Sequence, residues 1–429
     1  MRAVIRPNHR KHLGRRLLAS ASAAALSLLI ASCAASNTID FLYVTSNLQN
    51  PGQINVFEVD SESGALKQIA DSPYPSGGRN PVDEVASPNG KNLYVINHDD
   101  NTIVEFAIGT DGKLYPLQTV NTPGTEPVAA AISPTGNALY VLDYYGPAAP
   151  GQPSYTDLNP GPGALVVYPI ALDSKSGLGT IGSPQTIGAA NYLPVQCFPT
   201  NLTVTPNGSF VYVTNTNAVV VTTSPPVTGT VPTLPAVCPA SGTVSAFAVS
   251  PSSDTQVSGS PFSTGAGSQP TGIIADPGNA SIYVTDSRFN QLYTFSIQSG
   301  SGALSLAATT GTGNMPMGGT VITPASSSKF LYITNYKDGS LGIYSLASGT
   351  PSLLTTSNSG SSGPLCVLGE PDAFRFLYTA DYIGGTIGGA ELNPSNGTLT
   401  TNQNSPYPTA GQPTCVAAIT HTGGNKNGL

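Results

Sequence analysis

Short apolar stretches of strand length, each ended by a turn residue, recur along the whole chain. The stretch FLYVTSN at 41–47 returns six more times, as LYVINH, LYVLDY, VYVTNT, IYVTDS, LYITNY and LYTADY. Each copy is rich in β-branched and aromatic residues and ends on Ser, Asn or Asp, whose short side chain starts a turn by bonding nearby backbone. The pattern predicts seven equivalent strands.

Each of these strands is one member of a larger repeat. Upstream of six copies lies another strand, which closes on a turn such as SPNGK or TPNGS. In five of these units the strand starts at a proline and a second proline follows seven positions later, as at Pro81 and Pro88; in the sixth, Met317 takes the place of the first proline. A seventh strand of this kind, Pro413 to Thr420, ends the repeat and has no tyrosine stretch after it. Downstream of each copy, stretches such as INVFEVD predict a third strand, then a turn and a weaker fourth.

Four strands in each of seven units predict an all-β fold, a seven-bladed β-propeller with four antiparallel strands per blade. Because the repeat starts on a second strand and stops on a first strand, we expect the C-terminal innermost strand to join the N-terminal blade and close the ring; otherwise backbone groups would stay unpaired. The tyrosines of the repeated stretch are expected in the core between blades. They are Tyr43, Tyr94, Tyr140, Tyr212, Tyr283, Tyr332 and Tyr378, separated by 51, 46, 72, 71, 49 and 46 residues. The two long spacings predict insertions after two successive second strands, at 144–163 and 216–242, on the face where the first strands begin.

Composition supports this architecture. Only 9% of residues are charged, and 47 Gly and 38 Pro suit many short strands joined by turns rather than long helices. We expect the propeller at 40–421 and a disordered tail at 422–429.

The first 32 residues differ from the rest. Six basic residues precede the apolar run 17–30, which is too short for a transmembrane helix of roughly 20 apolar residues, and IASC follows at 30–33. We predict a lipoprotein signal peptide at 1–32, lipidation of Cys33 and a short linker at 33–39. An ordinary signal peptide with a chance cysteine is the alternative. The expected product is an exported lipoprotein anchored in the bacterial cell envelope.

Removing the leader changes the charge. The leader holds six of the 16 basic residues and none of the 23 acidic ones, so the mature chain carries a net charge of −13. Such a surface repels phosphate backbones, so no nucleic-acid partner is expected, and membrane attachment is expected through the lipid anchor only. We expect a monomer.

Four cysteines remain after the leader, an even number that suits an oxidising compartment and allows three pairings. Cys197 precedes a first strand and Cys238 lies in the insertion of the same blade, on the same face, so we pair them. Cys366 and Cys415 occupy the same register on adjacent first strands, where a bond between them would lock the closing strand if their Cα atoms lie roughly 4.4 to 6.8 Å apart. Since no Cys-x-x-Cys or Cys/His cluster occurs, no metal site and no other cofactor is predicted.

Seven units with LYVTN-like second strands and SPxG turns resemble the lactonase-type seven-bladed propellers, a family that includes bacterial 6-phosphogluconolactonase, and the related YVTN-repeat surface propellers. The resemblance covers Asp40 to Thr420. For members with lactonase activity it implies Arg and His where the inner strands begin. This chain departs from that pattern, because none of the residues directly after the first proline of these strands, or after Met317, is basic. They are Val82, Val128, Thr200, Thr271, Gly318, Leu365 and Thr414. An exported chain is also separated from 6-phosphogluconolactone, a cytosolic metabolite.

Polar and aromatic residues gather in the loops of the expected binding face. His98 is the candidate general base, with Glu84 or Glu126 orienting it, although a His beside two Asp also suits a solvated turn. Asp83 and Glu84 are neighbours in one strand and should point to opposite faces, so only one is expected to reach the channel. The candidate ligand-binding residues are Arg79, Asp83, Glu126, Tyr144, Phe198, Arg288, Tyr336 and Tyr382.

Three functions remain open for such a face. The first is binding of a small carbohydrate or lactone-like ligand, or of a protein partner, and the missing basic cluster favours it. The second is hydrolysis of a non-phosphorylated sugar lactone by a carboxylic ester hydrolase. The third is a non-enzymatic surface interaction protein.

Overall fold

A computed structural model describes residues 37–157, 159–216, 238, 241–250, 254–324, 328–371 and 374–421. The predicted signal peptide, the lipidation of Cys33 and the C-terminal tail lie outside the described residues, as does most of the insertion at 216–242. The elements of the described residues are all strands. No helix in these ranges has the length and apolarity that a membrane crossing requires.

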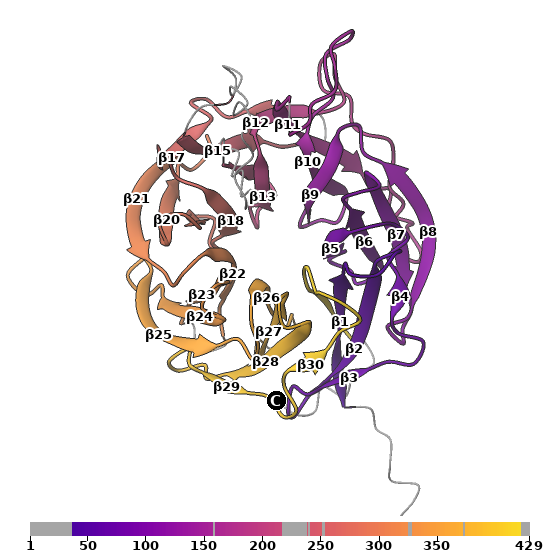
Figure 1. Ribbon diagram of the computed structural model, residues 1–429, viewed down its shortest axis with the longest axis vertical. Coiled ribbons are helices and arrows are strands. Elements are labelled where there is room, and N and C mark those ends of the chain that lie inside the picture. The colour runs from indigo at the N-terminus through magenta and orange to yellow at the C-terminus, as the bar shows by residue number, and fades with distance from the viewer. Residues whose placement is uncertain are drawn as a thin grey trace, which may run out of the picture.

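The strands form seven sheets arranged radially around a central axis, which confirms the predicted seven-bladed propeller (Figure 1). From the innermost strand outward, the first three blades are β31 (Ala417–Thr420), β1 (Thr38–Ser46), β2 (Gln53–Asp60), β3 (Leu66–Gln68), with β4 (Tyr74–Pro75) also on β2; β5 (Pro81–Ala86), β6 (Asn92–Asn97), β7 (Thr102–Ile108), β8 (Leu114–Asn121); and β9 (Thr125–Ile132), β10 (Ala138–Tyr145), β11 (Pro162–Pro169), β12 (Leu193–Cys197).

The other four blades follow in chain order around the ring. They are β13 (Pro199–Val204), β14 (Phe210–Asn215), β15 (Ser241–Ala248), β16 (Thr255–Gln256), with β17 (Phe262–Ala266) also on β15; β18 (Pro270–Ala275), β19 (Ser281–Asp286), β20 (Gln291–Ile297), β21 (Leu304–Gly311); β22 (Pro316–Ile322), β23 (Phe330–Asn335), β24 (Ser340–Ser345), β25 (Ser352–Asn358); and β26 (Pro364–Gly369), β27 (Phe376–Asp381), β28 (Thr386–Leu392), β29 (Leu399–Thr401), with β30 (Tyr407–Pro408) also on β28.

The ring closes through the chain ends, as predicted. β31 pairs antiparallel with β1, from Asp40 opposite Thr420 to Tyr43 opposite Ala417, and a bridge joins Ser46 to Pro413. The last strand of the chain therefore supplies the innermost strand of the first blade. This pairing satisfies backbone groups that an open ring would leave exposed.

The repeated tyrosines are buried between blades, which also confirms the prediction. The Tyr212 ring is fully buried, and its hydroxyl donates to the Gly302 carbonyl of the next blade at 2.9 Å. Gly302 has a positive φ of 73°, and an added Cβ there would overlap the Phe210 ring, so the turn needs glycine. The same bond to the next blade recurs from Tyr43 to Gly112, Tyr332 to Gly397 and Tyr378 to Gly64.

Two details differ from the sequence prediction. The register proline, meaning the proline that begins the innermost strand of a blade, is Pro316 in the sixth blade and pairs with Asn335. The sequence prediction placed this position at Met317, so the residue that follows it is Met317 and not Gly318. The long tyrosine spacing in the third blade arises from two insertions, because besides the loop after β10 a second one runs from 170 to 192 between β11 and β12. That second insertion packs on the second blade, where the Ile181 amide donates to the buried Glu105 carboxylate.

Candidate functional site

A cavity of about 310 Å³ opens on the axis where the innermost strands begin. Residues from every blade line it, which places it at the centre of the ring. Its lining residues are Val82, Asp83, Val128, Ala129, Tyr144, Pro199, Thr200, Asn201, Thr271, Met317, Leu365, Cys366, Thr414 and Cys415. Among these described lining residues none is Lys, Arg or His, and Asp83 alone carries a side chain that ionises near neutral pH.

The backbone explains why these residues face the cavity. In six blades the pairing register shifts directly after the first-strand proline, for example between Pro81 and Asp83 and between Pro199 and Asn201. In the first blade, the bridge from Ser46 to Pro413 adds one residue in the same way. Such a bulge breaks the strict alternation of faces, so consecutive side chains turn toward the axis. The residues that follow the register prolines therefore form the cavity wall.

Threonine hydroxyls in this wall join neighbouring blades. Thr200 Oγ1 donates to the Pro270 carbonyl at 3.0 Å, and Thr271 Oγ1 donates to the Pro316 carbonyl at 2.7 Å. Between the first and second blades, Thr414 Oγ1 donates to the Pro81 carbonyl at 3.0 Å. These hydroxyls hold the first strands at fixed spacing and give the cavity a rigid polar wall.

Asp83 and Glu84 lie side by side in β5 but have different surroundings. The Asp83 carboxylate lines the cavity and accepts the amides of Ala130 at 2.8 Å and Glu84 at 3.0 Å. Burial raises its pKa to about 7, against the lowering effect of those two donors. The Glu84 side chain is 4% exposed and turns away from the cavity to Thr45, which donates to it from both its hydroxyl and its amide.

Burial, followed by the charge of Asp83, raises the Glu84 pKa to about 8. The two carboxyls therefore titrate near neutral pH, and this part of the wall is less acidic than its sequence suggests. The oxygens of both carboxyls and the Cys415 sulfur lie within 4.8 Å of one another. Because Cys415 is bonded to Cys366, it offers no thiolate, and the set does not fit a metal ion.

Above the cavity, a mouth is formed by the residue after each second strand and the residue before each first-strand proline. In each pair, the residue after the second strand donates its backbone N–H to the carbonyl of the residue before the proline, as from His98 to Asn80 at 3.0 Å. Equivalent bonds run from Asn47 to Gln412, Thr216 to Phe198, Ser287 to Gln269, Tyr336 to Met315 and Tyr382 to Gly363. His98, Phe198, Tyr336 and Tyr382 therefore stand at this mouth, one on each of four different blades. Glu126 and Tyr144 occupy the corresponding positions of the third blade.

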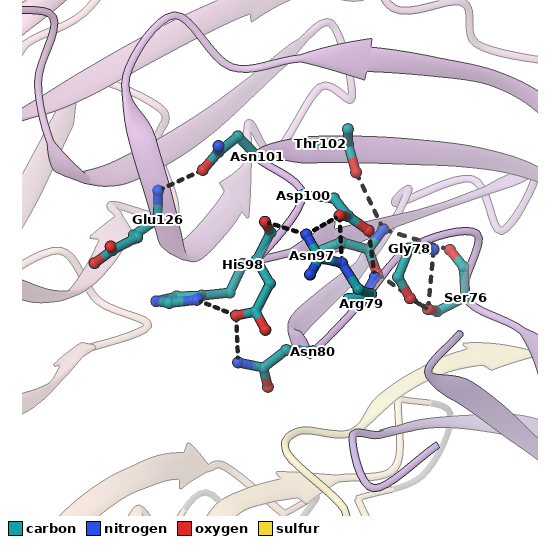
Figure 2. A network of polar contacts seen from close by, with 11 residues as sticks. Ser76, Gly78, Arg79, Asn80, Asn97, His98, Asp100, Asn101, Thr102 and Glu126 are labelled. Atoms are coloured by element: carbon teal, nitrogen blue, oxygen red, sulfur yellow. Dashed lines mark hydrogen bonds and ion pairs between the residues drawn. The ribbon is translucent and has the colours of Figure 1, made fainter. Parts of the chain in front are cut away.

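Backbone strain is concentrated at this mouth. Glu126, Phe198 and Met315 each precede or border a first-strand proline with φ values of 56°, 52° and 55°, a left-handed conformation that such side chains disfavour. The Asn101 side chain holds the Glu126 amide at 2.7 Å (Figure 2). Strain of this kind often accompanies binding sites.

His98 is oriented by a neighbour that the sequence prediction did not single out. Its Nδ1 lies 2.8 Å from Asp99 Oδ1, and Asp99 in turn accepts the Asn80 amide at 3.0 Å. Glu84 bonds to Thr45, and no hydrogen bond joins Glu126 to His98, so neither predicted orienting residue holds the ring. Figure 2 shows the His98 ring and the Glu126 carboxylate directed to the same side of the loops. Burial raises the Glu126 pKa, and the nearby His98 opposes that shift.

The two predicted arginines serve the loops rather than the cavity. Arg79 pairs with Asp100 (Figure 2), with Nη2 to Oδ1 at 2.6 Å, and also donates to the Asp99 carbonyl. Arg288 is exposed, donates to the Gly267 carbonyl and lies over the Phe289 ring. Each guanidinium closes its own turn.

One side of the mouth is an aromatic cluster braced by a disulfide. Cys197 and Cys238 are bonded, as predicted, with Cα atoms 5.3 Å apart, and they pack with Phe198, Tyr144 and Tyr145. The Tyr145 hydroxyl donates to Asp157 in the insertion after β10 at 2.7 Å. Cys366 and Cys415 form the second disulfide.

Sequence reasoning gave Asp99 no role and missed Asn201 and the cavity-facing threonines as site residues. Asn201 and Thr200 follow a register proline, so the repeat marked their positions, but the bulge that turns both inward leaves no residue pattern. Asp99 was visible in the HDD turn, and its bond to His98 depends on how that turn folds.

Comparisons with known proteins agree with this architecture. A family model described as "Lactonase, 7-bladed beta-propeller" matches residues 33–144 and 280–416. A search of curated proteins finds no match. Similar solved structures include a periplasmic gluconolactonase of Pseudomonas aeruginosa, with 18% identity, a TM-score of 0.65 and coverage of 89% of this chain and 99% of that chain. A candidate 6-phosphogluconolactonase of Bacteroides fragilis has 17% identity and a TM-score of 0.63, with coverage of 90% and 99%.

At these identities the structural likenesses support the fold alone. The family model, which matches more than half of the chain, shows the family: this chain belongs to the lactonase-type seven-bladed β-propeller family.

Proposed function

We propose that the protein binds an uncharged, hydroxyl-rich small molecule of the sugar-lactone class in the central cavity. The observation that carries this proposal is the cavity wall, which combines about 310 Å³ of space with Thr, Asn and Tyr side chains and contains no cation among its described residues. That volume lies at the small end of ligand pockets, where a single sugar ring fits.

The chemistry of the wall favours a neutral ligand. A phosphate or carboxylate placed beside Asp83 meets no cationic partner and faces a carboxyl group that ionises near pH 7. In its protonated form, Asp83 donates a hydrogen bond to a carbonyl or hydroxyl oxygen. Tyr144 offers an aromatic face at the cavity edge for the apolar side of a sugar ring.

Isothermal titration calorimetry tests this proposal. Glucono-1,5-lactone, its open-chain acid and its 6-phosphate are titrated into the full mature chain at pH 6.5. We expect the lactone to bind, and Asp83→Asn and Tyr144→Ala to weaken it at least about tenfold, the cost of one lost interaction of about 1.4 kcal/mol. Arg288→Ala, a matched change in the outer turn, should leave the affinity unchanged. Tighter binding of the phosphate ester would overturn the proposal.

Hydrolysis is a second candidate function, and the His98–Asp99 contact of 2.8 Å favours it. Asp99 fixes the imidazole, whose Nε2 then takes a proton from water as the oxygen adds to the lactone carbonyl. The ring C–O bond breaks, the alcohol oxygen recovers the proton from His98, and the product is a hydroxy acid.

A pH-stat assay on sugar and aliphatic lactones tests this candidate. His98→Ala and Asp99→Asn should each lower kcat by about 100-fold or more, as expected for loss of general-base catalysis. His421→Ala is the control, because that ring packs on Phe41 at the other end of the closing strand. Hydrolysis that survives both His98 and Asp99 substitutions places catalysis elsewhere, and a complete lack of hydrolysis leaves binding as the function.

Export with a lipid anchor at Cys33 belongs to the same proposal. Two disulfides in the propeller support an oxidising compartment. Mass spectrometry of the membrane fraction from cells that express the full chain should find a lipidated Cys33, and Cys33→Ala should release the protein from that fraction.

A further inference from the structure

The two disulfides of this propeller differ in their access to solvent. Cys197 and Cys238 are 0% and 5% exposed and pack among aromatic rings. Cys366 and Cys415 are only half-buried and line the central cavity. Thiol–disulfide exchange requires a thiolate to reach a disulfide sulfur, so only the cavity pair is open to attack in the folded state.

The cavity disulfide also occupies a structurally important position. Cys366 lies in β26 of the seventh blade, and Cys415 lies just before β31, the strand that closes the first blade. Their Cα atoms are 5.2 Å apart across the contact between the two innermost strands. The bond therefore links the seventh blade covalently to the segment that leads into the closing strand of the first blade.

Two acidic groups accompany the Cys415 sulfur. Carboxylate oxygens of Asp83 and Glu84 lie within 4.8 Å of it and of each other. Below neutral pH both carboxyls hold protons, because burial raises their pKa values to about 7 and about 8. A proton donor beside one sulfur makes that sulfur the better leaving group.

We propose that the Cys366–Cys415 disulfide is a thiol-exchange site for low-molecular-weight thiols that enter through the mouth of the cavity. The incoming thiolate attacks Cys366 Sγ and forms a new S–S bond, while the bond to Cys415 breaks and its electron pair leaves on Cys415 Sγ. The Asp83–Glu84 pair supplies the proton that converts this thiolate to a thiol. A second thiolate then attacks the mixed disulfide, releases the small-molecule disulfide and leaves Cys366 reduced.

The mixed disulfide places the added group inside the cavity, so it competes with any ligand that binds there. The exchange site itself depends on the cavity, the disulfide and the two carboxyls, and not on the function proposed above. A protein without lactone binding would still show it.

The test uses the folded mature chain and two reductants, 2-mercaptoethanol and reduced thioredoxin, the second being too large for the cavity. Free thiols are trapped with N-ethylmaleimide over time and located by peptide mass mapping. We expect 2-mercaptoethanol to expose Cys366 and Cys415 at least about tenfold faster than Cys197 and Cys238, in line with their difference in access. Thioredoxin should show no such preference for the cavity pair.

Equal rates for the two disulfides, or faster reduction of the cavity pair by thioredoxin, would overturn the exchange site. The proton donor is tested separately with Asp83→Asn, which should slow exchange several-fold at pH 6.5 and match the wild-type rate at pH 9, where the carboxyl has lost its proton. Asp111→Asn, in an exposed turn, is the matched control. An unchanged pH profile in Asp83→Asn and in Glu84→Gln rules out the acid step.

Discussion

Replacing Glu84 by Gln should change how the stability of the protein depends on pH. Glu84 is buried between β5 and β1 and receives two hydrogen bonds from Thr45. A glutamine has the same shape, accepts the Thr45 amide through its oxygen and bonds the Thr45 hydroxyl through its amide group. The substitution therefore removes the titration of this group and keeps its packing.

The direction of this pH dependence follows from the raised pKa of Glu84. Burial moves the Glu84 pKa from 4.5 to about 8, so between these values the folded protein holds a proton that the unfolded chain has released. The free energy of unfolding must then fall as pH rises from about 5 to about 8, and level off above that. Below pH 4.5 both states are protonated and this contribution is fully present.

The pKa difference sets the size of the effect. At 1.36 kcal/mol per pKa unit, the change from 4.5 to about 8 gives an upper bound of about 5 kcal/mol for this residue. We expect Glu84→Gln to match the wild type near pH 5 and to exceed its stability by a few kcal/mol at pH 9. In the variant, the free energy of unfolding should still fall as pH rises, because burial also raises the pKa of Asp143 to about 8.

Urea unfolding at pH 5.5 and pH 9, monitored by far-UV circular dichroism, measures both stabilities. Glu62→Gln, in an exposed turn, is the matched control and should follow the wild type. Parallel pH profiles for the wild type and Glu84→Gln would refute the burial argument for this carboxyl.

Three further predictions concern the contacts between blades and the mouth. Tyr212→Phe should cost about 1–3 kcal/mol in urea unfolding, because the buried Gly302 carbonyl loses its donor, whereas Tyr115→Phe on an exposed strand should cost nothing measurable. Gly302→Ala should lower the free energy of unfolding by more than 1 kcal/mol, because alanine disfavours the left-handed φ at this turn and its Cβ would overlap a buried ring. Equal stability of the variant and the wild type would show that the turn relaxes freely. The double change Cys197→Ser and Cys238→Ser should lower the free energy of unfolding by about 4 kcal/mol for a 41-residue separation, and a loss below about 1 kcal/mol would mean that the insertion is ordered without the bond.

Much of the site's location followed from the sequence, while its chemistry did not. The repeat placed His98, Glu126 and Tyr144 at one face, because residues at equivalent positions of a propeller lie at equivalent heights. Their partners depend on contacts that no local pattern records. The His98 ring bonds to Asp99, and Glu84 reaches Thr45, 39 positions earlier in the chain.

The sequence by itself determined the seven blades, the four-stranded repeat and the closure of the ring, and it indicated the pairing of Cys197 with Cys238, whereas the bond between Cys366 and Cys415 needed the structure. These features depend on strand periodicity, turn residues and the incomplete blade at each end, all of which are local or follow from counting. The tertiary structure alone decided which side chains face the axis, because a bulge after each register proline overrides the alternation of the strand. It also decided that Glu84 is buried against Thr45 while Asp83 lines the cavity, and that the pKa values of both carboxyls lie near neutral pH.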